Sequence, residues 1–305
     1  MTAHASLRPV GTRHYTPDPT AVRPRVARLP NGAADGPAAA PPIDSAGRAG
    51  SDGRTESGES LIQSRTTMTP DAPTEQSGVM NLFKPVGRSS ARFVYRLRPI
   101  LGVRKVGHAG TLDPFADGVL VACVGKGTRL VERIMNLPKR YRTTMRLGVT
   151  NETFDTERPL EPVPGARPVS AQDVASAVAG FVGSIKQIPP IYSAMRIGGV
   201  LSYELAKRGR PVELPPRPVT IYDIRINAYE WPVLDLAVEC GRGTYIRAIA
   251  RDLGIRLGCG AVCQTLRREA VGPFRAEDAI NLDDVPNDRV PPALIPLEKA
   301  IELIG

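Results

Sequence analysis

The spacing of hydrophobic residues along the chain changes at about residue 79. From there on, GVLVACVG is a continuous apolar run and predicts a buried strand, whereas RYRTTMRLGV alternates and predicts an amphipathic strand. Ser89 or Ser90 is expected to cap a helix in ARFVYRLRPILG. The other elements predicted are a strand in VMNLFKP, strands over 219–229 and 234–240, and helices over 170–181 and 244–257. Strands and helices that mix without a regular alternation indicate the α+β class.

The residues before this point show neither helical nor strand periodicity. Residues 1–79 contain 10 Pro, 8 Gly and 12 Ala but a single aromatic residue, Tyr15. Such a segment cannot bury enough apolar surface to offset the entropy lost on ordering, so residues 1–78 are predicted to be a disordered extension. Two alternatives stay open, namely an RNA-binding arm around Arg23, Arg25 and Arg28, and a start of translation at Met68 or Met80.

Composition limits the class of protein. The chain has 305 residues, of which 42% are hydrophobic and 23% charged, as in ordinary globular proteins. It has no run of about 18 apolar residues and no signal-peptide core, so we expect neither a membrane span nor secretion. The four cysteines are too few and too scattered for a disulfide framework, which indicates the reducing cytoplasm; they are Cys123, Cys240, Cys259 and Cys263.

The net charge of +9 lies entirely in the part expected to fold. Residues 1–79 contain eight basic and eight acidic side chains, which cancel. A basic folded part favours a polyanionic partner, above all nucleic acid. A general bias toward arginine in the coding sequence would produce the same excess, so charge alone leaves both interpretations open.

The segment GHAGTLDPFADG, residues 107–118, has the densest candidate chemistry. Its glycines and proline predict a compact loop beside a buried strand, where catalytic groups are often placed. An Asp before a Pro is also common in turns, so Asp113 has a purely structural alternative. His108 is the only histidine after residue 14, and Cys259 and Cys263 lack a second ligand pair, so no metal site is expected.

Three other kinds of site are disfavoured by their spacing. Residues 124–128 (VGKGT) lack the first glycine of a phosphate-binding loop. Residues 241–243 (GRG) lack the third glycine and the βαβ context of a dinucleotide site. No G-x-S-x-G is present, which argues against a hydrolase triad.

The loop and its surroundings resemble the TruB family of tRNA pseudouridine-55 synthases. GHAGTLDPFADGVLVACVGKGTR matches the family's nucleophile motif, and four more blocks match in the same order, so that the resemblance covers residues 79–274. These blocks are NLFKPVGRSS, KRYRTTMRLGVTNETFDTE, QIPPIYSAMRIGGVLSYELAKRGR and CGRGTYIRAIARDLG. The resemblance implies the pseudouridine synthase fold, with a mixed, mostly antiparallel central sheet flanked by helices and loops, and one catalytic domain over 79–274.

The resemblance also implies the reaction and its residues. Converting uridine to its C-glycoside requires covalent help from a carboxylate but no redox cofactor, and the resemblance makes Asp113 that nucleophile. Tyr141 matches the aromatic residue that stacks on the target base, and Arg247 the arginine that pairs with the carboxylate. Tyr245 is expected to line the same pocket. His108 would occupy the space left by the flipped nucleotide.

The resemblance implies tRNA, through its T-arm, as the partner. Residues 187–217 match a thumb-like RNA-binding insertion, in which Tyr192 and Tyr203 alternate with cations. Lys84 and the pair Arg104 and Lys105 are further candidates for phosphate contacts.

The end of the chain departs from the family pattern. Residues 275–305 are too short for a complete RNA-binding domain of PUA type and are expected to be a short tail. We expect a monomer that needs no protein partner and no membrane. Two alternatives remain, an RNA-guided synthase, which the short tail disfavours, and a catalytically silent RNA chaperone, which the presence of Asp113, Tyr141 and Arg247 disfavours.

Overall fold

The computed structural model describes residues 76–210, 212–285 and 294–305. All of them belong to one compact unit, Met68–Gly305. The disordered extension predicted over residues 1–78 lies outside the described residues as far as residue 75, and the first strand begins at Gly78.

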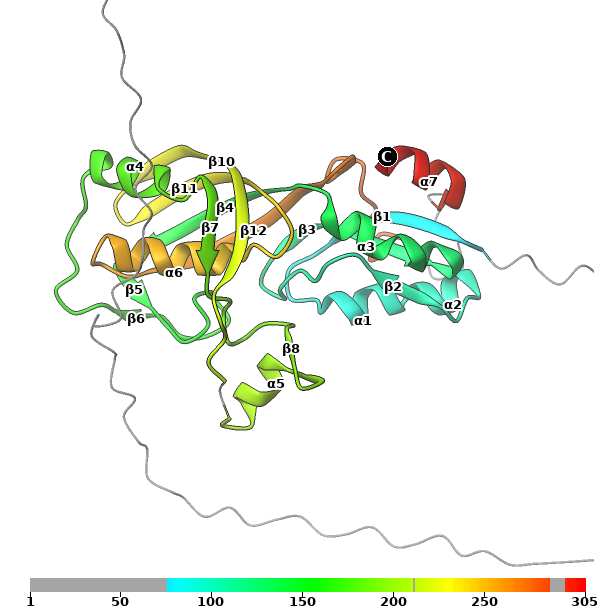
Figure 1. Cartoon of the computed structure of the whole chain (residues 1–305), viewed down its shortest axis with the longest axis horizontal. Coiled ribbons are helices and arrows are strands. Elements are labelled where there is room, and N and C mark those ends of the chain that lie inside the picture. Colours follow the sequence, from blue (N-terminus) through cyan, green and yellow to red (C-terminus); the bar gives the residue numbers. More distant parts are fainter. Residues whose placement is uncertain (1–75, 211, 286–293) are drawn as a thin grey trace, which may run out of the picture. The chain divides into compact units, whose positions relative to one another are not determined.

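A ten-stranded mixed sheet forms the centre of the fold (Figure 1). Its order is β14-β1-β3-β12-β4-β11-β10-β7, with β2 added on β3 and β13 on β12. All neighbouring strands are antiparallel except β12 and β3, which are parallel. This confirms the predicted α+β class. The strands are β1 Gly78–Lys84, β2 Val106–His108, β3 Asp117–Val124, β4 Lys139–Leu147, β7 Gly183–Gln187, β10 Arg217–Glu230, β11 Val233–Cys240, β12 Ala261–Val271, β13 Phe274–Arg275 and β14 Ile295–Pro296.

Helices and two small strand pairs complete the described part of the chain. The helices are α1 Ser90–Tyr95, α2 Leu97–Leu101, the 3-10 helix η1 Gly125–Leu130, α3 Val131–Asn136, α4 Ala171–Ala179, α5 Ser202–Lys207, α6 Ile246–Arg256 and α7 Leu297–Ile304. The pairs are β5 Val149–Thr150 with β6 Glu161–Pro162, and β8 Arg196–Ile197 with β9 Val200–Leu201.

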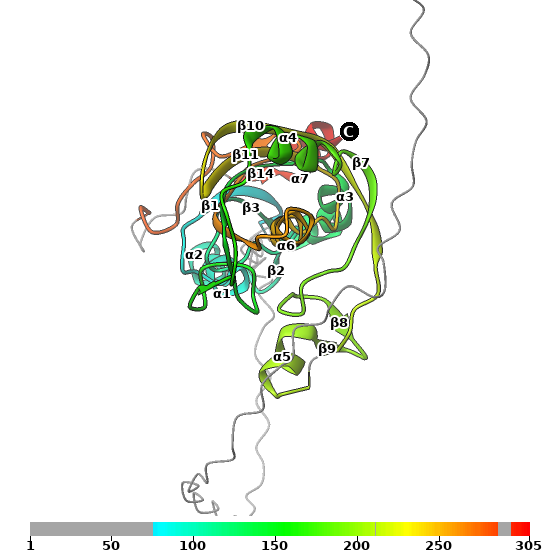
Figure 2. The ribbon, with the colours of Figure 1, turned by 90° about the vertical axis from the view of Figure 1, so that its left-hand side faces the viewer.

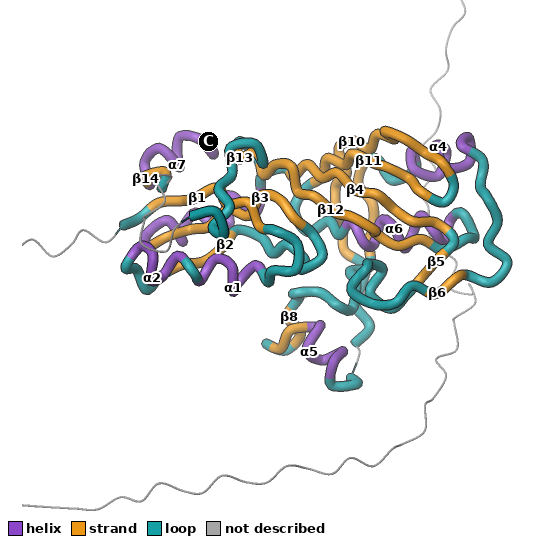
Figure 3. Tube along the Cα trace, turned by 180° about the vertical axis from the view of Figure 1, so that it is seen from behind, coloured by secondary structure: helices purple, strands orange, loops and turns teal. Residues whose placement is uncertain are grey.

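The sheet has two halves that differ in how they are covered. In the first half, α1 and α2 pack on one face of β1 and β3, while α3 and α7 pack on the other, and both strands are buried along almost their whole length. In the second half, α4 and α6 cover one face of β4, β10, β11 and β12. Strand β4 therefore alternates between buried and exposed residues, as its sequence predicts. Figure 3 shows these strands from behind.

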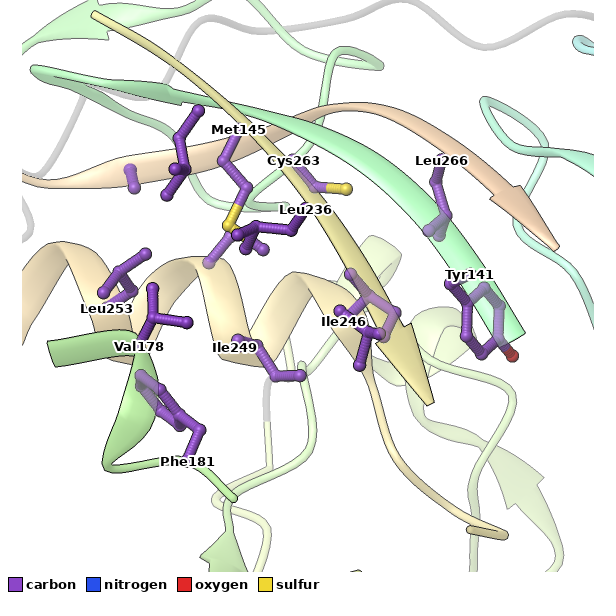
Figure 4. Packing of buried hydrophobic residues seen from close by; sticks show 14 of the residues in the cluster. Tyr141, Met145, Val178, Phe181, Leu236, Ile246, Ile249, Leu253, Cys263 and Leu266 are labelled. Atoms are coloured by element: carbon purple, nitrogen blue, oxygen red, sulfur yellow. The ribbon is translucent and has the colours of Figure 1, made fainter. Parts of the chain in front are cut away.

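The core of the second half lies between α6 and the strands that curve around it (Figure 2). Figure 4 shows Ile246, Ile249 and Leu253 of α6 facing Met145 and Leu236 of the sheet. Such an apolar stripe on an amphipathic helix supplies most of its tertiary stabilisation.

The two halves meet where β12 runs parallel to β3, in a contact that we call the seam. Only two residue pairs form it, Arg267 with Asp117 and Arg268 with Gly118. A Cβ atom at Gly118 would lie 2.3 Å from the carbonyl oxygen of Arg268, and its φ is +108°. The seam therefore requires glycine at this position.

The helices predicted over 170–181 and 244–257 are confirmed as α4 and α6, whereas the single helix predicted in ARFVYRLRPILG needs correction. Ser170 caps α4 by accepting a hydrogen bond from the Asp173 amide, at 3.1 Å. The segment ARFVYRLRPILG forms two short helices, α1 and α2, instead of one. Ser89 occupies the N-cap position of α1 but makes no capping hydrogen bond with its side chain, and the hydroxyl of Ser90 bonds to another loop.

The described residues after Phe274 pack against the first half of the sheet. Strand β14 pairs with Gly78 and Val79 at the start of β1. Leu282 is buried beside α1 and α2, and Ala300 of α7 is buried on the opposite face.

Candidate active site

The loop between β2 and β3 is fixed through its own backbone. The Leu112 carbonyl accepts a hydrogen bond from the Ser90 hydroxyl at 2.7 Å, and the Leu112 amide donates one back at 2.9 Å. The carbonyl of Pro114 accepts from the amide of Gly87 at 2.7 Å and from Lys84 Nζ at 3.4 Å. Asp113 thus lies between Leu112 and Pro114, whose carbonyls are both hydrogen-bonded to residues in the segment 84–90.

Arg247 holds the carboxylate of Asp113. Its Nε donates to Asp113 Oδ2 at 2.9 Å, and its Nη1 lies 3.3 Å from Asp155 Oδ2. Its remaining donors bond to the carbonyls of Thr153 and Tyr192. Arg247 and Asp155 are 3% and 2% exposed at their side chains, whereas Asp113 is 29% exposed. The ion pair therefore orients a carboxylate that solvent or a substrate can still reach.

The charge state of Arg247 follows from these contacts. Burial opposes its positive charge, but the carboxylates of Asp113 and Asp155 outweigh burial and raise the Arg247 pKa. Arg247 is the second residue of α6, so the first turn of this helix places its guanidinium between the two acids.

Tyr141 lies on the buried face of β4, opposite Val238 of β11 and Arg268 of β12. Figure 4 shows it at one end of the core cluster, beyond Ile246 and Leu266. Burial raises the Tyr141 pKa, and the nearby charge of Arg268 works in the opposite direction. The phenol is therefore neutral at physiological pH.

Tyr245 precedes α6 and is fixed by a side chain from β7. The amide of Tyr245 donates to Gln187 Oε1 at 2.8 Å, and Gln187 Nε2 donates to the Tyr245 carbonyl at 3.2 Å. Burial raises the pKa of the Tyr245 phenol, with a smaller contribution from the Asp113 carboxylate. The structure thus places Tyr245 close enough to Asp113 and Arg247 to respond to their charges.

His108 belongs to the opposite flank of the loop. It lies on β2, opposite Ala122 of β3, and is half-buried. Burial and the charge of Arg268 lower its pKa, so the imidazole is neutral at physiological pH. A neutral, half-buried ring suits a role in stacking more than in proton transfer.

The cationic residues predicted to contact RNA do not all occupy comparable positions. Lys84 is wholly buried, and its Nζ donates to the carbonyls of Pro85, Arg88 and Pro114, so it cannot contact a phosphate. Arg104 and Lys105 are exposed.

Residues 187–217 contain β8, β9 and α5, which extend away from the sheet in Figures 1 and 2. The Ser202 hydroxyl donates to the Ile191 carbonyl at 2.6 Å and anchors the base of this segment. The amine of Lys207 lies 5.5 Å from the ring of Tyr203. Its exposed cations are Arg196, Lys207, Arg208, Arg210 and Arg217.

Sequence reasoning missed Asp155, Ser90 and Arg268. Asp155 forms the second ion pair of Arg247, Ser90 anchors Leu112, and Arg268 donates to the carbonyls of Gly110 and Thr111. Asp155 and Ser90 lie within blocks that carry the family resemblance, but no local pattern distinguishes them from loop and cap residues.

Within the described ranges, no group of three or more His, Cys, Asp or Glu side chains could hold a metal ion. Over the same residues, no helix is long and apolar enough to cross a bilayer.

Comparison with known proteins places this site in a family. Residues 98–246 match the sequence model of the TruB family pseudouridylate synthase N-terminal domain, and residues 247–301 match the tRNA pseudouridylate synthase B C-terminal domain. The chain is 38% identical over 225 residues to the tRNA pseudouridine synthase B of Clostridium novyi, covering 74% of this chain and 78% of that protein. It is 41% identical over 229 residues to that of Syntrophotalea carbinolica, covering 74% of each.

Solved structures give the same fold. A Cbf5-Nop10-Gar1 complex matches with a TM-score of 0.57 and 30% identity, and an H/ACA RNP bound to a substrate RNA containing 2'-deoxyuridine matches with a TM-score of 0.54 and 28% identity. Each alignment covers 75% of this chain and 62% of the other.

Proposed function

The chain belongs to the TruB family of pseudouridylate synthases, and we propose that it isomerises uridine 55 in the T-loop of tRNA to pseudouridine, with Asp113 as the nucleophile. The observation that carries the proposal is the ion pair between Asp113 and the buried Arg247. It orients a partly exposed carboxylate toward solvent or a substrate, as a nucleophile requires.

The reaction breaks the bond between N1 and C1′, forms a bond between C5 and C1′, and moves one hydrogen from C5 to N1. No atom is gained or lost, and no oxidant is needed. Attack of the Asp113 carboxylate on C1′ and attack on C6 both use the same group, and the later steps release it again. We propose that the phenol of Tyr141, on β4, stacks on the base and assists removal of the C5 proton.

Access to the base requires that the target nucleotide leave its stack, which costs a few kcal/mol. We propose that the neutral ring of His108 occupies the vacated space and offsets part of this cost by stacking. Tyr245 would then line the far side of the pocket, held by Gln187.

The T-arm would bind along the exposed cations of residues 187–217, together with Arg104 and Lys105. The curated relatives are named tRNA pseudouridine synthase B, which supports tRNA as the substrate. We propose a cytoplasmic monomer that acts without a cofactor or protein partner. An RNA-guided synthase is the second candidate, because the H/ACA structures share the fold.

The decisive experiment maps pseudouridine in unmodified tRNA and in an isolated T-arm incubated with the purified chain. We expect modification of both RNAs at uridine 55 without a guide RNA. Asp113→Asn should lower kcat by at least about a thousandfold while RNA binding persists. Asp117→Asn is the matched control, because Asp117 pairs with the exposed Arg267 of β12 and not with Arg247, and this variant should leave kcat within about threefold. Modification that depends on a guide RNA would contradict the proposal.

A further inference from the structure

Arg268 lies at the seam and is 2% exposed. Its backbone pairs with Gly118 of β3 on one side and with Tyr141 of β4 on the other. Its side chain points toward the loop that carries Asp113. Arg267, the preceding residue, points to the opposite face and forms a two-fold ion pair with Asp117, with distances of 2.9 and 2.7 Å.

The guanidinium of Arg268 connects three backbone carbonyls. Nε donates to Val119 at 2.7 Å, Nη2 to Gly110 at 3.1 Å, and Nη1 approaches Thr111 at 3.4 Å. Gly110 and Thr111 form the turn between His108 and Asp113, and Val119 belongs to β3. A single side chain from the second half of the sheet thus binds both the loop and the strand that follows it.

This arrangement is costly for stability. Within the described ranges, no carboxylate lies within 4.0 Å of the Arg268 guanidinium, although Arg247 has two such partners. A buried charge without an ionic partner carries a large desolvation penalty, which carbonyl dipoles compensate only in part. Leucine or methionine would fill a buried site more favourably. The guanidinium is therefore better explained by its hydrogen bonds to the loop and to β3.

We propose that Arg268 is a positioning residue of the active site, which fixes the turn at Gly110 and Thr111 and thereby sets His108 and Asp113 against Tyr141 and Arg247. This inference rests on the function proposed above. Reactive groups contributed by two halves of a sheet must keep a fixed separation, since a displacement of about 1 Å can cost roughly a hundredfold in rate. Two arginine side chains cross the seam: Arg267 pairs with Asp117 at the start of β3, whereas Arg268 bonds to the loop itself and can therefore fix the position of Asp113.

The electrostatic environment agrees with the geometry. Burial lowers the His108 pKa first, the charge of Arg268 lowers it further, and a hydrogen bond with the Gly110 backbone opposes both. The charge of Arg268 also acts to lower the pKa of Tyr141, which lies on the neighbouring strand β4. His108 therefore reports on the position of Arg268 without any measurement of activity.

The test compares Arg268→Gln, Arg268→Lys and the control Arg267→Gln in the full chain. Two quantities are measured, kcat and KM on a T-arm RNA, and the titration of the His108 ring by NMR. For Arg268→Gln we expect kcat to fall between about tenfold and a hundredfold at nearly unchanged KM, and the His108 pKa to rise. For Arg268→Lys we expect a smaller loss of kcat, because the charge is kept while the forked geometry is lost, and a His108 titration close to that of the wild type. The control should match the wild type in both readouts.

Several outcomes would overturn the inference. One is wild-type kcat in a folded Arg268→Gln protein whose only change is a lower melting temperature. If that variant does not fold, wild-type kcat in Arg268→Lys has the same meaning. An unchanged His108 titration in Arg268→Gln would remove the electrostatic link. Failure of the wild type to form pseudouridine would instead contradict the proposed function, and the titration would still test the placement of Arg268.

Discussion

The two halves of the central sheet follow different rules. In the first half, β3 is buried on both faces and its sequence, GVLVACV after the initial Asp, has no polar alternation. In the second half, β4 is covered on one face and its sequence alternates at almost every step. The first half is therefore a three-layer structure and the second a two-layer structure. The pattern of apolar residues along a strand thus indicates whether one or both of its faces are covered.

The candidate site draws on both halves. Asp113 and His108 come from the loop and strand next to β3, while Tyr141 and Arg247 come from β4 and α6. Each half has a core of its own, and the short seam joins them together with the side chains that cross it. The site therefore depends both on the core of each half and on the contacts that join the two halves.

The largest expected effect concerns Arg247, which belongs to the second half and holds Asp113 of the first. Asp155→Asn would leave the buried Arg247 with one carboxylate, and removal of one partner of a buried pair costs about 3–5 kcal/mol. We expect this loss in the free energy of unfolding by urea denaturation, together with a reduced kcat. Glu152→Gln, an exposed neighbour in the same loop, is the control and should cost less than about 0.5 kcal/mol. Equal costs for the two variants would mean that the second ion pair of Arg247 is dispensable.

Leucine truncation in the two halves should sharpen the comparison. Leu120 belongs to β3, which described helices cover on both faces, so the structure around a cavity there can collapse little. Leu236 belongs to β11, which α4 and α6 cover on one face, so the structure around it can relax more. We expect Leu120→Ala to cost about 4 kcal/mol and Leu236→Ala about 3 kcal/mol, because the cost grows with the cavity that remains. Denaturation curves measured side by side give the difference, and the reverse order would contradict the two descriptions of the halves.

A polar substitution should also distinguish the two halves, with a smaller effect on the free energy of unfolding. Val121→Thr places a hydroxyl between β3 and its second layer of helices, at a cost of about 1–3 kcal/mol. Ala237→Thr on β11 faces the side that none of the described helices covers and should cost less than about 0.5 kcal/mol. Thermal unfolding of both variants checks this. A comparable cost for Ala237→Thr would show that the outer face of β11 is covered in solution.

The last effect is a dependence on pH and concerns a feature that the halves share, namely one buried lysine each. Burial lowers the pKa of Lys84 on β1 and of Lys139 on β4 to about 8 from the ordinary 10.5. Between pH 8 and 10.5 the unfolded chain binds more protons than the native state, so these groups make the free energy of unfolding rise with pH across that window. We expect Lys84→Met and Lys139→Met each to reduce this rise. Identical pH profiles in the wild type and both variants would contradict the shifts.

How much of this was accessible from the sequence depends on the range of each interaction. Local patterns predicted β3, β4 and α4 correctly, because periodicity involves neighbours in the chain. The break between α1 and α2 was not predicted, since the pattern of apolar residues continues across it.

The site itself depends on contacts between distant parts of the chain. Asp113 and Arg247 are 134 residues apart, and only the family resemblance linked them in advance. The burial of Lys84 was missed because a lysine that bonds to carbonyls has the same sequence signal as one exposed to solvent. Arg268 was missed for the same reason, as its neighbour Arg267 is exposed and looks identical in the sequence.

Strand β14 has a consequence for the behaviour of the protein in concentrated solution. An open sheet edge offers unpaired amides and carbonyls on which a second molecule can add a strand. At the β1 side this edge is occupied by two residues, Ile295 and Pro296, and the proline has no amide hydrogen to donate. A strand so short, ending in proline, is a poor template for further pairing. Strand β14, together with Ile280, which hydrogen-bonds to Asn81 and Phe83, thus protects the apolar first half of the sheet from edge-to-edge aggregation.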